Sequence, residues 1–293
     1  MSFLSHLISG ISLGSIYAII ALGYTMVYGI AKMLNFAHGD VIMVGAYACF
    51  FMVSRYEIPA VVGVLSAVVI CTLLGIIIER LAYKPLRSAT SLAVLITAIG
   101  ISYFLQNAAQ LLWTSNPKVF NSLMGDGSVK LFDGRLSISV TAIVTIVVCV
   151  IIMLALTWFT GRTKMGKAMR ACSEDKGAAQ LMGINVNFTI SMTFAIGSAL
   201  AAIAGVLLCS AYPILTPTTG SMPGIKAFTA AVFGGIGSIP GALLGGVLLG
   251  IIEIFGKAYI STQLSDAIVF VVLIVVLLVK PTGLLGKQVQ EKV

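Results

Sequence analysis

Long apolar runs, separated by short polar or charged stretches, cover most of the 293-residue chain. A helix needs about 20 apolar residues to cross the hydrocarbon core of a bilayer. Five runs reach that length, at residues 7–30, 59–78, 92–113, 137–159 and 186–212. Shorter or glycine-broken runs lie at residues 41–53, 225–239, 241–255 and 267–279. We therefore predict an all-α, polytopic membrane helix bundle of eight or nine membrane segments, some of them broken or re-entrant, forming one domain over residues 1–293.

The composition agrees with lipid as the main solvent. Apolar residues make up 59% of the chain and charged residues 10%, against roughly half and a quarter in soluble domains. The formal charge of +8 raises the question of a nucleic-acid partner, but the basic residues fall in short clusters at the ends of apolar runs. Such clusters are topology signals, so no nucleic-acid partner is predicted. The five cysteines have no CxxC spacing, and neither a metal site nor a disulfide framework is predicted.

The basic clusters predict the orientation of the chain, because lysine and arginine in short loops mark the cytoplasmic side. The clusters placed inside are Arg80, Lys84 and Arg87; Arg162, Lys164, Lys167, Arg170 and Lys176; and, in the tail, Lys280, Lys287 and Lys292. The mixed-charge loop 115–136 then lies outside, where the bases Lys118, Lys130 and Arg135 are partly balanced by Asp126 and Asp133. Residues 234–241 form an inner turn, the C-terminus is cytoplasmic and the uncharged N-terminus is outside.

Polar residues inside or between the apolar runs are the candidates for a solute pathway. Asn35, His38 and Asp40 lie between two apolar runs, and polar backbone at membrane depth must line a cavity or be buried in protein. The alternatives are a cytoplasmic turn in which Asn35 or Asp40 caps the next helix, or a proton relay through His38 and Asp40. Gln106 and Asn107 lie inside the run 92–113, where they either bond a partner helix or face the pathway.

Catalytic and phosphate-binding chemistry have little support in the chain. No Ser/His/Asp spacing, metal-ligand cluster or pair of carboxylates is apparent, so no catalytic and no metal-binding residues are predicted. The glycine-rich stretch 231–246 has neither a preceding strand nor a basic side chain, which favours a tightly packed hairpin over a phosphate loop. Glu253 and Lys257 lie one helical turn apart, and we predict a structural ion pair near the outer surface.

The largest polar insertion, residues 161–187, predicts two short helices at about 165–171 and 175–182, ended by Gly183. A basic interfacial helix lying on anionic lipid is one interpretation. Ala178, Ala179 and Gly183 match the A-A-x-x-x-G core of the "EAA" loop of bacterial ABC importer permeases, with Gly177 where that family often has Glu. This resemblance implies the other interpretation, a coupling loop that docks on an ATPase subunit, with Arg170, Glu174 and Asp175 as its polar members.

Longer motifs support a more specific resemblance. The segments are LGSIYAIIALGYTMVYGI at 13–30, LNFAHGD at 34–40, the loop 164–185, AVFGGIGSIPGALLGG at 231–246 and KPTGLLG at 280–286. Together they resemble the smaller membrane subunit of the branched-chain (Liv-type) amino acid importers. Urea and short-chain amide importers use similar membrane subunits, so the resemblance leaves those substrates open.

This resemblance implies a permease in a bacterial cytoplasmic (inner) membrane that forms half of a translocation pathway and is not itself an enzyme. The implied partners are a second, related permease subunit, two ATP-binding subunits and an external or periplasmic substrate-binding protein. The chain has no GxxxxGK[ST] loop, so ATP and Mg are expected on the partner ATPases, with no cofactor on this chain. The contrasting class is an ion-coupled secondary transporter, for which His38 and Asp40 are the candidates for an ion site. A channel would need a repeated filter or a ring of pore-lining charges, and neither is apparent.

Overall fold

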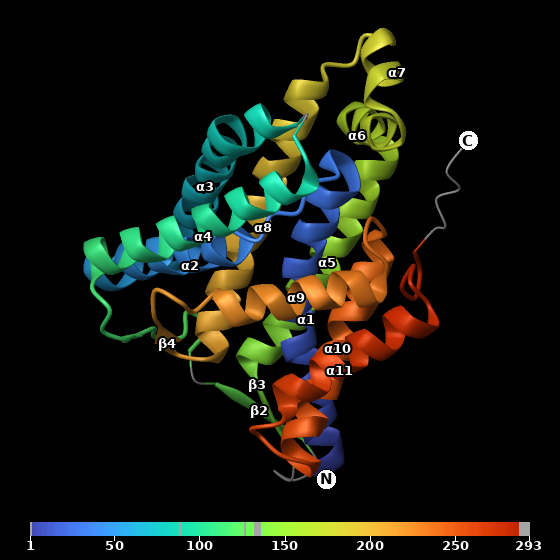
Figure 1. Ribbon diagram of the computed structural model, residues 1–293. Helices are drawn as coiled ribbons and strands as arrows, with labels where there is room; N and C mark the ends of the chain where they lie inside the picture. The colour runs from blue at the N-terminus through green and yellow to red at the C-terminus, as the bar shows by residue number, and fades with distance from the viewer. Residues whose placement is uncertain (1, 88, 126, 132–135, 287–293) are drawn as a thin grey trace.

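The computed structural model describes residues 2–87, 89–125, 127–131 and 136–286, and almost all of the fold is helical. Helices α1 (Ser2–Ala31) and α8 (Val186–Ala211) are mostly buried inside the chain, and α1 runs through the middle of the bundle (Figure 1). The bundle therefore has two central helices around which the others pack.

Seven further long or apolar helices complete the bundle: α2 (His38–Phe50), α3 (Ala60–Ile78), α4 (Ser91–Trp113), α5 (Val140–Arg162), α9 (Ser221–Gly234), α10 (Ile239–Tyr259) and α11 (Ser265–Val279). Among the described residues, α1, α3, α4, α5, α8 and α10 are long and apolar enough to cross a membrane, while α2, α9 and α11 are shorter. The prediction of a polytopic helical membrane protein is confirmed.

Local sequence explains where several of these helices begin and end. Side-chain oxygens of Thr90, Ser139, Asn185 and Ser238 cap the N-termini of α4, α5, α8 and α10 by accepting a backbone N–H. Two helices end in irregular turns instead, because α2 continues into a π-helical turn at Phe51–Arg55 and α3 into another at Glu79–Tyr83, followed by a 3₁₀ turn at Lys84–Leu86. Such turns are common near functional sites.

Glycine allows α1 and α10 to pack with their backbones nearly in contact. A Cβ atom added at Gly246 would lie 2.5 Å from the Cα atom of Ala18, and one added at Gly250 would lie 2.3 Å from the Cα atom of Gly14. In lipid no hydrophobic force drives helices together, so close packing through small residues is a main source of their association. The glycine content of the chain therefore stabilises the centre of the bundle.

The loop 115–136 contains secondary structure that the sequence did not predict. Strand β1 (Lys118–Val119) pairs antiparallel with β4 (Ile214–Leu215), and β2 (Ser128–Leu131) pairs antiparallel with β3 (Leu136–Ser139). The predicted membrane run from 137 is therefore wrong at its start, because residues 136–139 are a strand and α5 begins at Val140. Five residues used in the predicted orientation lie outside the described residues, namely Asp126, Asp133, Arg135, Lys287 and Lys292.

The predicted cytoplasmic and external loops lie at opposite ends of the molecule. Helices α6 (Lys164–Glu174) and α7 (Lys176–Leu181) form one end, and the N-terminus and the β2–β3 pair lie at the other (Figure 1). The turn between α9 and α10 is on the α6 side, because Ile239 packs against the cluster that contains Met169 and Cys172. This arrangement agrees with the predicted inner turn.

Two glycines in that turn, Gly235 and Gly237, have φ values of 107° and 94°, a region that favours glycine. The segment after α11 returns to the same turn, where the backbone N–H groups of Leu284 and Leu285 donate to the carbonyls of Phe233 and Gly234 at 2.9 Å. A Cβ atom at Gly235 would lie only 2.4 Å from the backbone nitrogen of Gly286. The prediction of tight packing around the glycine-rich stretch is confirmed.

Candidate functional site

The polar insertion folds into two short helices, close to the predicted bounds. Asp175 begins α7, since its Oδ1 atom accepts from the backbone N–H groups of Gly177 and Ala178 at 2.7 and 3.0 Å. Gly183 ends it with a φ of 82°. The N–H of Gly183 donates to the carbonyl of Gln180, and that of Ile184 to the carbonyl of Ala179, which is the Schellman arrangement. The predicted glycine stop is confirmed.

The two alanines of the coupling loop face in different directions. Ala178 is exposed, whereas Ala179 is buried in a cluster with Met26, Ile30, Met169 and Cys172. Helix α7 therefore rests on α1 and α6 through Ala179 and presents its other face outward.

The outward face of α7 ends in two large apolar side chains, Leu181 and Met182, which are 90% and 83% exposed. Glu174 is also exposed, and Arg170 donates to the carbonyl of Gly161 at the end of α5 at 3.2 Å. An exposed apolar tip bordered by polar groups is typical of a protein contact surface.

Lys176 connects α7 to the end of α1. Its Nζ atom donates to the carbonyl of Ala31 at 2.8 Å, and Ala31 is the last residue of α1. Lys32 follows with a φ of 58°, and residues 32–37 are non-helical until α2 begins. Burial lowers the pKa of Lys176 below its ordinary value, and the nearby positive charges of Arg87 and Lys32 lower it further. The bond from Lys176 therefore joins α7 to the residue that directly precedes the unwound segment before α2.

The structure brings Asp40 and Gln106 together, although they are far apart in the chain. The Nε2 atom of Gln106, on α4, donates to Oδ1 of Asp40 at 2.9 Å, and it also lies 3.2 Å from the hydroxyls of Ser102 and Ser221. Asp40 is buried near the start of α2. These contacts join α2, α4 and α9 at one polar point.

Asn35 and His38 lie near this point but have other neighbours. Asn35 accepts a hydrogen bond from the hydroxyl of Tyr83 at 2.9 Å, and the His38 ring packs against Tyr24 with the centroids 4.7 Å apart. The alternative that Asn35 or Asp40 caps α2 is wrong, because the cap position is Ala37 and no side chain bonds there.

Asn107 lies apart from these residues, since it is exposed and its amide donates to the carbonyl of Tyr103 on its own helix at 2.7 Å. Of the five predicted pathway residues, the structure therefore joins Asp40 and Gln106 directly.

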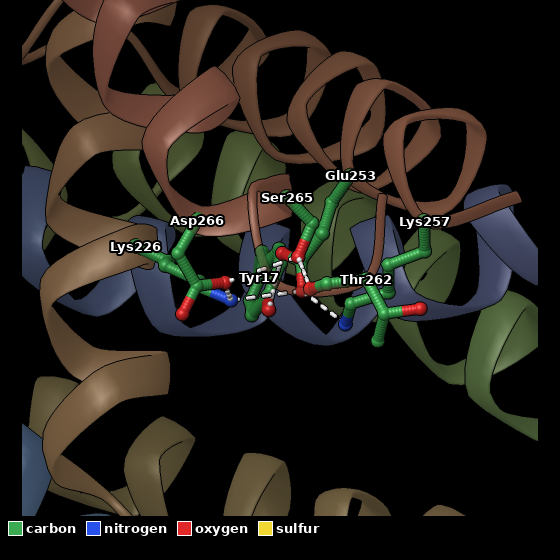
Figure 2. A network of polar contacts seen from close by, with 7 residues as sticks. All are labelled: Tyr17, Lys226, Glu253, Lys257, Thr262, Ser265 and Asp266. Carbon is green, nitrogen blue, oxygen red and sulfur yellow. Dashed lines mark hydrogen bonds and ion pairs between the residues drawn. The ribbon is translucent and has the colours of Figure 1, made fainter. Parts of the chain in front are cut away.

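A second polar network joins four helices around Glu253 (Figure 2). Glu253 is buried and accepts from Lys226 at 2.8 Å, from Lys257 at 2.6 Å and from the hydroxyl of Tyr17 at 2.8 Å. Lys226 also lies 2.6 Å from Asp266. The predicted pair between Glu253 and Lys257 is confirmed, but it is one part of a larger network that links α1, α9, α10 and α11.

A third network was also missed, at the end of α3. Glu79 is fully buried, pairs with Arg87, and accepts from the hydroxyl of Ser191 at 2.6 Å. Arg87 also bonds the side chain of Asn187. Arg87, which sequence analysis treated only as a topology signal, therefore ties the turn after α3 to the start of α8.

Comparison with known proteins identifies the family. Residues 6–277 match the family model described as the branched-chain amino acid transport system permease component. The chain belongs to this permease family. This permease is 46% identical to the high-affinity branched-chain amino acid transport system permease protein LivH of Escherichia coli K12, over 99% of this chain and 98% of the relative. It is 45% identical to the permease protein BraD of Pseudomonas aeruginosa PAO1, over the same shares.

A solved structure supports the fold alone. The complex described as PsaBC from Streptococcus pneumoniae with a Fab contains a chain that aligns with a TM-score of 0.50 and 15% identity, covering 96% of this permease and 93% of that chain.

Lys226 and Tyr17 of the permease were not found by sequence reasoning, although a signal existed for one of them. Lys226 lies inside the apolar run 225–239, and an ionisable residue within a membrane segment marks a candidate functional position. Tyr17 carries no such signal, because tyrosine is common in apolar helices and only the fold places it beside Glu253. In the described part of the chain, no three His, Cys, Asp or Glu side chains gather as a metal site would require.

Proposed function

We propose that this permease forms half of the translocation pathway of a binding-protein-dependent ABC importer for branched-chain amino acids. The observation that carries the proposal is the 45–46% identity, over nearly the whole chain, to relatives named as high-affinity branched-chain amino acid permeases. Those names favour branched-chain amino acids over urea or short amides as the substrate. They also favour an ATP-driven importer over an ion-coupled transporter.

The partners in this proposal are a second related permease, two ATP-binding subunits and an external or periplasmic substrate-binding protein. ATP and Mg would be bound by the ATPase subunits, and this chain would carry no cofactor. The exposed apolar tip of α7 supports an ATPase contact, since Leu181 and Met182 lie at the end of the molecule and gain most from burial in a partner groove.

We place the permease in a bacterial cytoplasmic membrane with the α6–α7 end inside. The bases that support this orientation are Arg162, Lys164, Lys167 and Arg170, which lie at that end. The N-terminus and the β2–β3 pair then face outside, where a binding protein would deliver the substrate.

Coupling would run from α7 to the pathway through the end of α1. Closure of the ATPases would move α7, and the bond from Lys176 to the carbonyl of Ala31 would pass that movement to residues 32–37. This segment leads directly to Asp40 and its contact with Gln106. If the contact between Asp40 and Gln106 has two arrangements, a change from one to the other would switch the pathway between inward-open and outward-open states.

Uptake in cells tests the substrate. A strain that lacks this chain should lose high-affinity uptake of labelled leucine, and expression of the chain should restore it. Unlabelled valine and isoleucine should compete, while urea and acetamide should not. If urea or acetamide competes and valine and isoleucine do not, the substrate is urea or an amide instead. Unchanged leucine uptake in the deletion strain would contradict the proposal.

A further inference from the structure

A cavity of about 230 Å³ opens beside Glu253, bounded by α1, α8, α9, α10 and the segment that contains β4. Its lining contains charged side chains and apolar ones, together with the hydroxyl groups of Tyr17, Tyr212 and Thr219. The charged part contains Lys226, Glu253 and Lys257, and the apolar part contains Leu13, Leu208 and Met222. This division matches a small molecule with a charged head and an apolar body.

The charged part suits a ligand that carries both signs and no net charge. The network beside the cavity contains two lysines and two carboxylates, namely Lys226, Lys257, Glu253 and Asp266, so its charges sum to zero. A zwitterion brings one ammonium and one carboxylate, which leaves the sum unchanged. An ion of one sign would leave an uncompensated charge in a mostly buried site, which is costly.

The positions of the charges also fit the head group of an amino acid. Glu253 is buried and would accept from an α-ammonium group, while the ammonium groups of Lys226 and Lys257 would donate to an α-carboxylate. Figure 2 shows that the side chains of Lys226 and Lys257 approach Glu253 from opposite sides. A zwitterion could therefore exchange its own hydrogen bonds for some of those within the network.

The apolar part and the size of the cavity limit the ligand further. The volume of about 230 Å³ corresponds to roughly eight water molecules at about 30 Å³ each, which is enough for a small amino acid. Leu13, Leu208 and Met222 would cover an aliphatic side chain.

We propose that this cavity is a binding site within the permease for a zwitterionic amino acid with an aliphatic side chain. The inference rests on the proposed function, because it assumes that such a molecule passes through the protein. Binding at this site must be weak, since a transported molecule has to leave it again. The binding protein would supply high affinity, and this site would receive the substrate on release.

A network whose only role was to hold helices together could be replaced by apolar residues of the same volume. Buried ion pairs contribute little net stability compared with apolar residues of the same volume, and Lys226 and Glu253, although buried, line a cavity. The double variant Lys226→Met/Glu253→Met removes one charge of each sign and keeps the volume. Its remaining charges, Lys257 and Asp266, are 34% and 44% exposed and can be satisfied by water.

Protection of an introduced thiol measures binding directly. Met222 lines the cavity and is 43% exposed, and the five native cysteines are buried, so Met222→Cys provides a reactive site on a quiet background. The importer complex is purified through this chain, without the binding protein, and treated with a water-soluble maleimide. At leucine concentrations about ten times the dissociation constant, labelling should slow roughly tenfold, because only the unoccupied fraction reacts.

The probes and the control define what is recognised. Leucine should protect the thiol, whereas 4-methylpentanoate and 3-methylbutylamine, which each carry one charge, should not. Gln263→Cys is the matched control, since Gln263 is exposed in the loop between α10 and α11 and does not line the cavity. Its labelling rate should be the same with and without leucine. In the Lys226→Met/Glu253→Met background, protection at Met222→Cys should be lost while the complex remains assembled.

Each result decides the proposal. Labelling of Met222→Cys that is indifferent to leucine would overturn it, and so would protection that survives the double Met variant or that either single-charge analogue reproduces equally well. If the double variant does not assemble, Met222→Trp, which fills the cavity, should abolish the leucine-induced rise in melting temperature of the complex, and an unchanged rise would overturn the proposal. If cells take up leucine but leucine does not protect the Met222→Cys thiol, this site alone is refuted. If leucine uptake and thiol protection are both absent, the proposed function is refuted as well.

Discussion

Leu181 and Met182 form the apolar tip of α7, and they are 90% and 83% exposed. Complete burial of such a side chain contributes about 1.5–3 kcal/mol. If the tip enters a groove of an ATPase subunit, Leu181→Asp loses that contribution. Because about 1.4 kcal/mol corresponds to a tenfold change in affinity, the variant should bind the ATPase roughly 10- to 150-fold more weakly.

The assay titrates the purified ATPase subunit onto the immobilised permease in detergent and measures the dissociation constant. The stability of the permease itself should change by no more than about 0.5 kcal/mol, because Leu181 is a surface residue. Ala179→Asp is the contrasting variant, since Ala179 is buried two positions earlier in the same helix. An unpaired charge there should lower the free energy of unfolding of the permease by about 3 kcal/mol or more.

Unchanged ATPase affinity in both Leu181→Asp and Met182→Asp would refute the assignment of α7 as the docking helix. The alternative of an interfacial helix on anionic lipid makes the opposite prediction. In that case the variants would bind the ATPase normally but would bind vesicles of anionic lipid less well than the wild type.

Three further predictions concern residues that support the site. Glu79→Ala leaves Arg87 without its carboxylate and should lower the free energy of unfolding by about 3–5 kcal/mol, while the double variant Glu79→Met/Arg87→Met should recover most of this loss; thermal exposure of the buried cysteines to a thiol reagent measures both. Gly183→Ala places a side chain at a φ of 82° and should cost about 1–2 kcal/mol, seen as faster amide hydrogen exchange in α7. The pKa of Lys176 is lowered, so between that pKa and the ordinary value of 10.5 the unfolded chain binds more protons than the folded chain. In that pH window the free energy of unfolding of the wild type, relative to that of Lys176→Met, should therefore rise with pH. A difference that does not change with pH would contradict the burial of Lys176.

The membrane segments could be predicted because the thickness of the bilayer sets a length that apolar runs must meet. The helices of the coupling loop were also predictable, since Asp175 and Gly183 are strong local start and stop signals. The strands β2 and β3 were not, because each has only four residues and their pairing is a tertiary contact that no local pattern announces.

The site was less predictable than the fold. Asp40 and Gln106 were each found as polar residues near or inside an apolar run, but only the packing of α2 against α4 shows that they bond to each other. Lys226 was missed because its run was judged by length, without weighing the single charge inside it. The direction in which Ala179 faces could not be predicted either, since a six-residue helix has too few positions to show which face is buried.

Transport by the reconstituted protein tests the central claim most directly. Proteoliposomes that contain this chain, its permease partner and the ATPases are supplied with leucine-loaded binding protein, and uptake of labelled leucine is measured with and without internal ATP. We predict uptake only when ATP, Mg and the binding protein are all present, and no uptake by this chain alone under a proton or sodium gradient. Leucine uptake by this chain alone, driven by an ion gradient and indifferent to ATP, would contradict the account.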